Sequence, residues 1–281
     1  MSKQTAEQKI LSLTIEEYES VQPISSFHHD GREIVFHTPN RKTLWRAQTL
    51  LSKEPETIEW IAGFRTGDVL VDVGANVGMY SIWAAATRQT QVFAFEPEAH
   101  NYALLNRNIV SNCLTDRVTA YCAALLDESR FDLLHLSASE IGGSCHSFGE
   151  ELDFRLQPAQ FRYTQGCFSV SLDELVEKKV IPVPQHIKID VDGLEHKVLI
   201  GAQKTLTHPA LKSLLVEINT HVTQHMNSVD LMQDHGFQYS KEQVEKYKVK
   251  EGPFEGVSNF IFTKMVKAPH LHREQIPILR A

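Results

Sequence analysis

The stretch VLVDVGANVGMY, Val69 to Tyr80, decides the fold of this chain. An apolar run rich in β-branched residues carries one acidic residue, Asp72, and stops at Gly74. A helical pattern begins near Gly78. This order predicts a buried strand, a tight turn and the N-terminus of a helix. At such a corner glycine lets a ligand approach the backbone, and the first helical N–H groups have no partners within the helix.

The residues of the turn distinguish between cofactors. A dinucleotide-binding loop reads G-x-G-x-x-G, whereas this loop reads GANVG, with Asn76 in place of the second glycine. Asp72, just before the turn, suits a cationic ligand better than an anionic one. Both departures favour S-adenosylmethionine, which carries an amine and a sulfonium and no phosphate, over a nicotinamide or flavin dinucleotide. The alternative is a plain strand-turn-helix corner that binds nothing.

The composition describes an ordinary globular chain. With 281 residues, of which 42% are hydrophobic and 22% charged, it can bury one large core, and we expect one domain with an N-terminal elaboration over residues 1–66. A formal net charge of -7 and a pI near 6.1 argue against nucleic acid or an anionic membrane as the main partner. We therefore expect a small or neutral substrate.

The cysteines and the N-terminus indicate where the protein works. The four cysteines form no C-x-x-C pair and no zinc-like spacing, so reduced thiols in a cytoplasm are the simplest interpretation. The N-terminus has no continuous apolar stretch, and no run in the chain approaches the roughly 18 apolar residues of a spanning helix. The sequence thus predicts a cytoplasmic protein with neither a secretion signal nor a membrane span.

A second strand, Gln91 to Phe95, ends on Glu96 and Pro97. Glu96 follows Gly74 by about one βαβ length, where an acidic side chain at a strand end can accept hydrogen bonds from both ribose hydroxyls of an adenosine. The alternative is a surface carboxylate. A third strand is expected over Val118 to Leu125, with the small residues Ala123 and Ala124 leaving room for an adenine ring or only packing densely.

Residues 131–171 change the pattern to alternating and aromatic, with the glycine pair Gly142 and Gly143 in the middle. This predicts a hairpin or flap inserted between the third and fourth core strands, which closes over the substrate. Ser171 is expected to cap a helix over residues 172–177, with Glu174 completing a capping box.

The second informative stretch is Ile187 to Ala202, IKIDVDGLEHKVLIGA. A short strand leads to Asp190, and Gly193 turns the chain into a helix. Asp190, Asp192 and Glu195 are three carboxylates within six residues, a costly cluster unless solvent, a cation or a polar substrate uses it.

The remaining elements follow from periodicity and turn residues. We expect helices over residues 3–20, 54–64, 80–87, 101–110 and 226–235, strands over residues 32–37, 213–218, 236–240 and 257–263, and a surface arm over residues 266–281. Strands that alternate with helices, with chemical signals at the strand ends, indicate an α/β protein with a doubly wound, mostly parallel sheet.

At this point the sequence resembles the class I S-adenosylmethionine-dependent methyltransferases and, more closely, the FkbM-type O-methyltransferase family. The resemblance covers roughly Ile34 to Phe262. It rests on four stretches: DVGANVG at 72–78, FEP at 95–97, SLDEL at 171–175, and KIDVDGLE at 188–195 continuing to Gly201 and Ala202. The family commonly has Glu where this chain has Asp192, a departure that keeps the charge.

The resemblance implies a Rossmann-like sheet of seven strands with the last strand antiparallel, over residues 67–265. It also implies methyl transfer to a hydroxyl, often on a sugar, a glycolipid or a natural product. The residues expected at the cofactor are Asp72, Gly74, Asn76, Gly78, Tyr80, Glu96, Pro97, Ala123 and Asp190. The N-terminal elaboration and the C-terminal arm lie outside the resemblance, and we expect them to set partners or a homo-oligomer.

An alcohol oxygen must attack the sulfonium methyl in line, so the site needs positioning together with a base or a metal. The catalytic candidates are Asp190, Glu195 and His221, with His196 as a further one. A Mg²⁺ site at Asp190, Glu217 and Asn219 is conceivable and not favoured. Two other functions stay open: a non-catalytic, cofactor-binding partner protein, and an NAD-dependent oxidoreductase.

Overall fold

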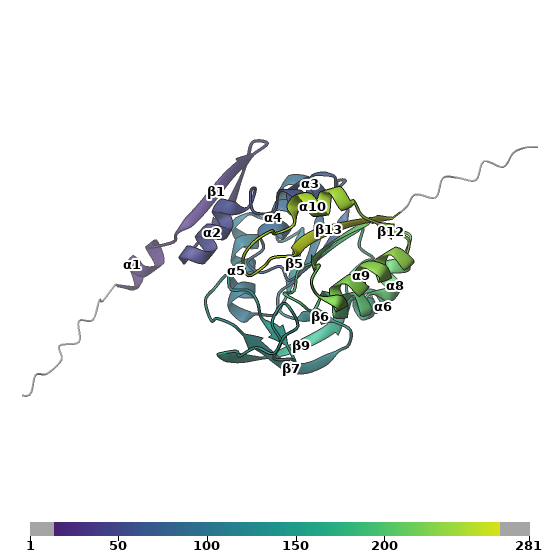
Figure 1. Cartoon of the computed structure of the whole chain (residues 1–281). Helices are drawn as coiled ribbons and strands as arrows, with labels where there is room; N and C mark the ends of the chain where they lie inside the picture. Colours follow the sequence, from purple (N-terminus) through teal and green to yellow (C-terminus); the bar gives the residue numbers. More distant parts are fainter. Residues whose placement is uncertain (1–13, 265–281) are drawn as a thin grey trace, which may run out of the picture.

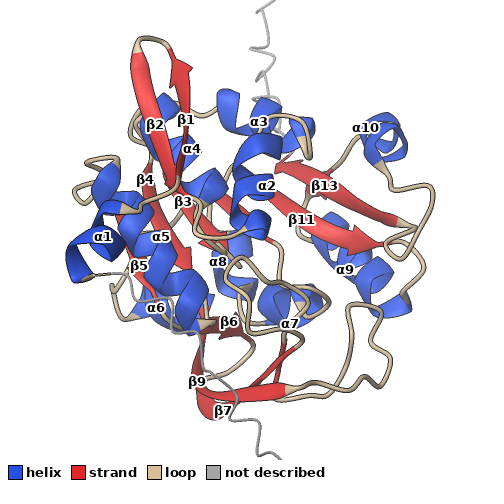
Figure 2. Cartoon of the chain, turned by 90° about the vertical axis from the view of Figure 1, so that its left-hand side faces the viewer, coloured by secondary structure: helices blue, strands red, loops and turns tan. Residues whose placement is uncertain are grey.

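The central sheet is built from the strands around the Gly74 corner. In the computed structural model, which describes residues 14–264, seven strands lie in the order β12-β13-β11-β10-β3-β4-β5 (Figures 1 and 2). Their bounds are β3 Val69–Val73, β4 Gln91–Phe95, β5 Val118–Tyr121, β10 His186–Ile189, β11 Ser213–Asn219, β12 Phe237–Gln238 and β13 Val257–Lys264. β13 pairs antiparallel with both β11 and β12, and the other pairs are parallel. The expected doubly wound sheet with an antiparallel last strand is confirmed.

Helices cover both faces of the sheet. Alternate residues of β3 enter two separate cores, with Val71 in one and Leu70 in the other, as the period of two along a strand requires. The Leu70 side is covered by α3 (Pro55–Ala62), α4 (Met79–Arg88) and α5 (Ala99–Ser111). The opposite side is covered by α6 (Leu172–Glu177), α7 (Glu195–Ile200), α8 (Gln203–Thr207) and α9 (Thr223–Asp234), and α10 (Lys241–Tyr247) packs beside β13.

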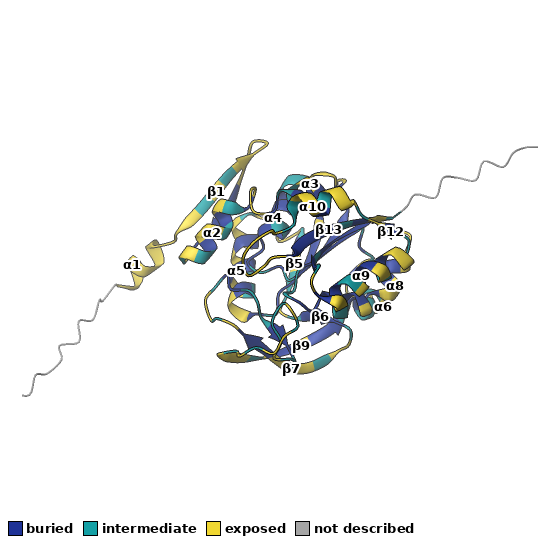
Figure 3. Cartoon of the chain, in the orientation of Figure 1, coloured by how far each residue is buried: buried dark blue, intermediate teal, exposed yellow. Residues whose placement is uncertain are grey.

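The N-terminal segment adds a hairpin and two helices. Its elements are α1 (Ile15–Ser20), β1 (Ile24–His29), β2 (Arg32–His37) and α2 (Arg41–Thr49). The strand expected at 32–37 is β2, whereas β1 and α2 were not foreseen. α1 buries none of its residues and stands off the body beside the hairpin (Figures 1 and 3). Residues 3–13 of the expected first helix, and the expected arm at 266–281, lie outside the described residues.

The inserted segment forms a second sheet. β6 (Ala124–Leu126), β7 (Arg130–Leu136), β8 (Ser147–Phe148) and β9 (Tyr163–Ser171) lie in the order β6-β9-β7-β8. The expectation of one strand over 118–125 is therefore wrong. The chain bends at Cys122 and Ala123 and leaves the central sheet, because β6 pairs with β9 instead of continuing β5.

Two further expectations meet the structure here. Ser171 caps α6 as expected, its hydroxyl accepting the Glu174 N–H at 3.2 Å. The prediction of a capping box is wrong, because the Glu174 carboxylate binds Lys178 and Ser129 and not the backbone N–H of Ser171. Within residues 14–264 no helix has both the length and the apolar character needed to cross a membrane.

Candidate active site

Gly74 sits where β3 meets the end of β10. Its φ of +80° lies in the left-handed region, and a Cβ at this position would lie 1.8 Å from the carbonyl oxygen of Asp190. Gly78, with φ of +87°, starts α4, and a Cβ there would lie 2.3 Å from Leu105 Cδ1. The two glycines are thus needed for the tight approach of backbone to backbone and of helix to helix.

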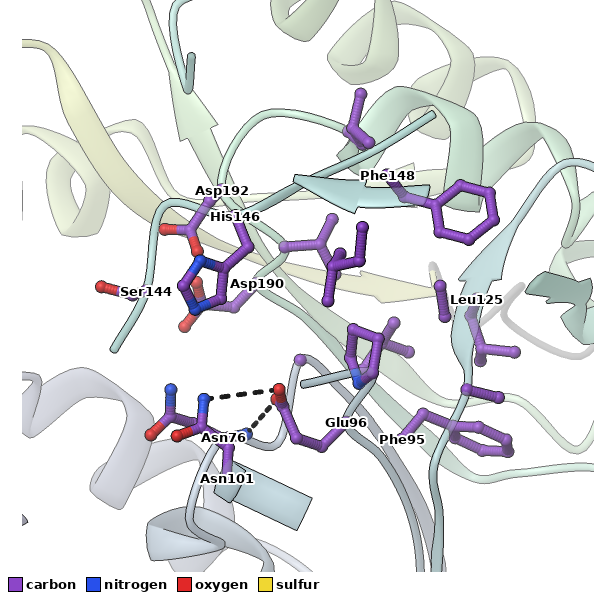
Figure 4. A pocket seen from close by; sticks show the side chains of 18 of the residues that line it. Asn76, Phe95, Glu96, Asn101, Leu125, Ser144, His146, Phe148, Asp190 and Asp192 are labelled. Carbon is purple, nitrogen blue, oxygen red and sulfur yellow. Dashed lines mark hydrogen bonds between the residues drawn. The ribbon is translucent and has the colours of Figure 1, made fainter. Parts of the chain in front are cut away.

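Two cavities meet at this loop. The larger, with about 730 Å³ of space, lies between the ends of β3 and β4 and the inserted sheet (Figure 4). The smaller, with about 440 Å³, lies between α2, the start of α4 and the end of β10. The residues that line both are Arg46, Gly74, Asn76 and Asp190.

Glu96 lines the larger cavity and is held in place by backbone N–H groups. It is 4% exposed, and its Oε2 accepts the Asn76 backbone N–H at 2.8 Å (Figure 4). Its Oε1 accepts the Glu98 N–H at 2.9 Å. The Asn101 amide also approaches Oε1, at 3.5 Å. Burial raises the pKa of Glu96 to about 7. A carboxylate has about four acceptor positions, so Oε2 keeps one for a ligand hydroxyl, and Oε1 gains one where a ligand replaces the long contact with Asn101.

Asp190 lies between the two cavities and is held by a buried lysine. Lys188 Nζ donates to Asp190 Oδ2 at 2.8 Å, and the Lys188 side chain is only 2% exposed. Burial alone would raise the pKa of Asp190, but the Lys188 ammonium outweighs it and holds that pKa below its ordinary value. Asp190 is therefore an ionised acceptor near neutral pH.

Asp192 lines the larger cavity, and its pKa is shifted in the opposite direction from that of Asp190. Its Oδ2 accepts the backbone N–H of Cys145 at 2.6 Å. Burial, and then the neighbouring charge of Asp190, raises the pKa of Asp192 to about 6. A carboxyl whose pKa is close to the working pH is suited to accepting a proton.

Asp72 borders the smaller cavity from the buried strand β3. Its Oδ2 accepts the Ser81 hydroxyl at 2.6 Å, and its Oδ1 is buried without a hydrogen-bond partner in the described structure. Burial raises the pKa of this carboxyl. An unpaired buried carboxylate oxygen is costly, and this one keeps an acceptor position open toward the smaller cavity.

The glycine pair of the inserted segment lies across the mouth of the larger cavity. Asn76 Nδ2 donates to the carbonyl of Gly143 at 2.6 Å, and the Asn101 side chain bonds both Gly142 N and Gly143 O. From the other side, Arg46 Nε donates to Gly142 O at 2.8 Å. The hairpin is in the expected place, and its action as a flap stays a prediction.

Most of the expected cofactor residues gather at these cavities. Gly74, Asn76, Glu96, Pro97, Ala123 and Asp190 line the larger one, and Asp72 and Tyr80 line the smaller one. Gly78 lines neither. Nothing in the sequence marked three other lining residues, Arg46, Asn101 and His146, as part of the site.

The catalytic candidates separate in space. Only Asp190 reaches the two cavities. The buried Glu195 accepts the backbone N–H groups of Val191 and Gly193 at 3.0 and 3.1 Å, so it holds the turn that follows Asp190. His221 lines a different cavity with Arg155 and Asn219, and His196 lines neither of the two that contain Asp190.

The residues considered for Mg²⁺ are engaged elsewhere. Asn219 Oδ1 accepts the backbone N–H of His221 at 3.0 Å. Burial, followed by the charge of Asp190, raises the pKa of Glu217 well above its ordinary value. Within residues 14–264, no three His, Cys, Asp or Glu side chains come together in a way that would hold a metal ion.

Comparison with known proteins identifies the family. The methyltransferase FkbM domain matches residues 72–239, from the buried Asp72 through Asp190 to Tyr239, just after β12. The chain belongs to the FkbM methyltransferase family. It is a methyltransferase with the Rossmann-like fold of that family.

Two relatives are similar over about two thirds of the chain. The hexuronic acid methyltransferase AglP of Haloferax volcanii is 26% identical over 190 residues, which are 66% of this chain and 71% of that protein. The 31-O-demethyl-FK506 methyltransferase FkbM of Streptomyces tacrolimicus is 27% identical over 201 residues, 64% of this chain and 76% of that protein. Among solved structures, the precorrin-6y C5,15-methyltransferase of Geobacter metallireducens has a TM-score of 0.45 at 15% identity, covering 78% of this chain and 93% of that chain.

Proposed function

We propose that this FkbM-family methyltransferase uses S-adenosylmethionine to methylate a hydroxyl oxygen of a small-molecule acceptor, a sugar or a natural product. One observation carries the cofactor: Glu96 presents a buried carboxylate, fixed by the N–H groups of Asn76 and Glu98, to the larger of the two cavities that meet at Gly74. The acceptor class rests on the relatives, one named for a hexuronic acid and the other for an O-demethyl natural product.

The lining of the larger cavity fits an adenosine. Glu96 would take the ribose diol, and Ala123, Leu125 and Phe148 offer an apolar wall for the base. Among residues 14–264 no lysine lines this cavity, and its arginine, Arg46, lies at the junction with the smaller one. This arrangement suits a nucleoside better than a pyrophosphate. When bound, the cofactor supplies an electrophilic methyl group.

The chain itself positions the acceptor and removes its proton. The ionised Asp190, held by Lys188, accepts a hydrogen bond from the acceptor hydroxyl and orients its oxygen. When the acceptor oxygen takes up the methyl group, a carboxylate of this chain would accept the hydroxyl proton. Asp192, with a pKa of about 6, is matched to that transfer. Asp190→Asn should lower kcat about 100-fold or more, since positioning and acid-base effects are each of that order.

Titration calorimetry tests the cofactor. S-adenosylhomocysteine should bind and NAD should not, whereas binding of NAD alone would establish the oxidoreductase alternative. Turnover of labelled S-adenosylmethionine in a screen of sugars, glycolipids and polyketides then separates an enzyme from a non-catalytic partner protein.

Chelation tests whether a metal takes part. If Asp190 and Asp192 act directly, EDTA-treated protein should keep full activity and added Mg²⁺ should change nothing. Loss of activity on chelation, restored by Mg²⁺, would refute direct action of the carboxylates.

A further inference from the structure

His225 is a buried titratable side chain that lines neither of the two cavities that contain Asp190. It lies in the first turn of α9 and is 2% exposed. Both ring nitrogens bind backbone groups at the carboxyl edge of the sheet. Nδ1 accepts the N–H of Asn219, the last residue of β11, at 3.1 Å, and Nε2 donates to the carbonyl of Gly193 at 2.9 Å. The imidazole therefore links the end of β11 to the turn that follows β10.

The partners of this ring fix its protonation state. A backbone N–H can only donate, so Nδ1 carries no proton and the ring proton lies on Nε2. Burial is the largest cause of a lowered pKa of His225, which keeps the imidazole neutral. His225 is thus held in the one tautomer that can make both hydrogen bonds.

The turn that His225 contacts carries Asp192 in an uncommon backbone conformation. Asp192 has φ of +57°, in the left-handed region, and Gly193 follows with φ of +120°. A residue other than glycine keeps such a conformation only where its surroundings hold it. Glu195 accepts the N–H groups of Val191 and Gly193, on either side of Asp192, at 3.0 and 3.1 Å. The bond from His225 fixes the carbonyl of Gly193, so the turn is held through both its N–H groups and its carbonyl.

We propose that His225 is a positioning residue for methyl transfer, which directs the Asp192 carboxylate into the larger cavity by holding the carbonyl of Gly193. The inference rests on the function proposed above, in which Asp192 accepts the proton of the acceptor hydroxyl. Asp192 lines that cavity (Figure 4), and Glu195 and His225 meet at the turn, where Oε2 lies 3.5 Å from Nε2. Because His225 lines neither cavity, it acts on the reaction through the turn alone.

Two substitutions separate the two hydrogen bonds of His225. An asparagine side-chain oxygen takes the place of Nδ1 and accepts the Asn219 N–H, but His225→Asn has no donor that reaches Gly193. A glutamine side-chain nitrogen takes the place of Nε2, so His225→Gln keeps the donor to Gly193 and loses the acceptor for Asn219. Each variant loses the ring and one hydrogen bond, so their stabilities should fall by similar amounts.

Amide hydrogen exchange measures the turn without any ligand. The Cys145 N–H donates to Asp192 Oδ2 at 2.6 Å, so it exchanges faster when the carboxylate moves. In His225→Asn, the amides of Cys145 and Gly193 should exchange about 5- to 10-fold faster, the effect of one lost hydrogen bond on a local opening. In His225→Gln they should change less than about twofold. The amides of the buried strand β3 are the reference, because they exchange only on global unfolding.

Turnover with S-adenosylmethionine and the acceptor found by the screen gives a second measurement. His225→Asn should lower kcat about 10- to 100-fold, since a small displacement of a reacting group has that effect, and should leave KM for S-adenosylmethionine within about twofold. The acid limb of its pH-rate profile should move below pH 6, because burial is the largest cause of the raised pKa of Asp192 and a loosened turn admits water. The charges of Asp190, Arg46 and Lys53 also act on Asp192, and both variants leave them in place.

His225→Gln should keep both the kcat and the acid limb of the unchanged protein. A further control is His235→Asn, the same substitution at the C-terminal end of α9, which lines neither cavity and should change neither the exchange nor the kcat.

Three outcomes overturn the inference. Equal effects of His225→Asn and His225→Gln would show that the bond to Gly193 has no special part. Exchange that is faster to the same degree in the β3 amides would show that His225 contributes only to global stability. A normal kcat with an unmoved acid limb in His225→Asn would show that the placement of Asp192 does not depend on His225. An unchanged protein that methylates no acceptor would instead refute the proposed function, and hydrogen exchange still tests whether His225 holds the turn.

Discussion

The pKa of Glu96 makes cofactor binding depend on pH. Burial raises this pKa to about 7, so in the free protein about half of the carboxyls are protonated at neutral pH. A ribose diol donates its hydrogen bonds to the ionised form, so binding lowers the pKa and releases a proton. Affinity for S-adenosylhomocysteine should therefore rise with pH, by about tenfold between pH 6 and pH 8, because the ionised fraction rises by that factor.

Glu96→Gln should remove both the pH dependence and much of the affinity. In the wild-type side chain, the N–H groups of Asn76 and Glu98 each donate to one Glu96 oxygen, at 2.8 and 2.9 Å. A glutamine has only one side-chain oxygen, so its N–H₂ group would face one of these two donors and that hydrogen bond would be lost. Together with the loss of a charge-assisted pair of hydrogen bonds to the ligand, this should cost roughly 2–3 kcal/mol, or about 30- to 150-fold in Kd.

Calorimetry at pH 6, 7 and 8 measures both effects, with circular dichroism to show that the variant is folded. The exposed Glu242 on α10 lines neither cavity, so Glu242→Gln serves as the charge-matched control and should behave as the unchanged protein. An affinity that does not vary with pH in the unchanged protein, or an unchanged Kd in Glu96→Gln, would show that Glu96 does not hold the diol.

Three other predictions concern the base, the glycine pair and the fold. Asp192→Asn should lower kcat and abolish the acid limb of the pH-rate profile near pH 6, and a limb that persists would assign it to another group. A glutamate-specific protease should cut after the exposed Glu140 more slowly when cofactor and acceptor are both bound, and equal rates would argue for a passive hairpin. Burial lowers the pKa of His186 to about 4, so the unfolded chain takes up its proton first as pH falls, and unfolding free energy should drop by about 2 kcal/mol from pH 7 to pH 5 in urea titrations. His186→Gln should show a correspondingly smaller drop, and the same drop in both proteins would exclude His186 as its source.

The elements that sequence patterns predicted most closely are buried strands. β3, β4 and β2 have the bounds expected for them, because apolar and β-branched runs between turn residues leave little choice of where pairing starts and stops. α2 escaped notice for the opposite reason. It buries only Thr43 and Ala47 along its length, so it has almost no apolar stripe.

Long-range pairing explains the break at Cys122 and Ala123. The local pattern VTAYCAALL reads as one strand, and β5 and β6 part only because β9, more than 40 residues later, pairs with Ala124–Leu126. The bend is useful to the site, since Ala123 borders the larger cavity as a result of it. No propensity within the stretch contains that information.

The catalytic candidates show how far the position of a residue at a strand end predicts whether it reaches the site. Asp190 was found because parallel strands end at one edge of a sheet, which brings it beside Gly74 and Glu96 whatever the loops do. His221 follows β11 at the same edge, yet two residues of turn carry it into another cavity, where its ring packs on Gly256. Sheet topology places the last residue of a strand, and it does not place the residues of the turn beyond.

The site contains residues that motif spacing predicts and residues that only tertiary contacts bring there. Asp72, Gly74, Glu96 and Asp190 follow directly from the motif spacing, and they form the sheet side of both cavities. Arg46 and the glycine pair reach the opposite side only through tertiary contacts between segments about 100 residues apart, such as the bond from Arg46 to Gly142. A family match that begins at residue 72 can therefore identify the methyl-transfer chemistry without containing all of the residues that enclose the ligand. Variants of α2 are for this reason the sharper probes of what this particular chain binds.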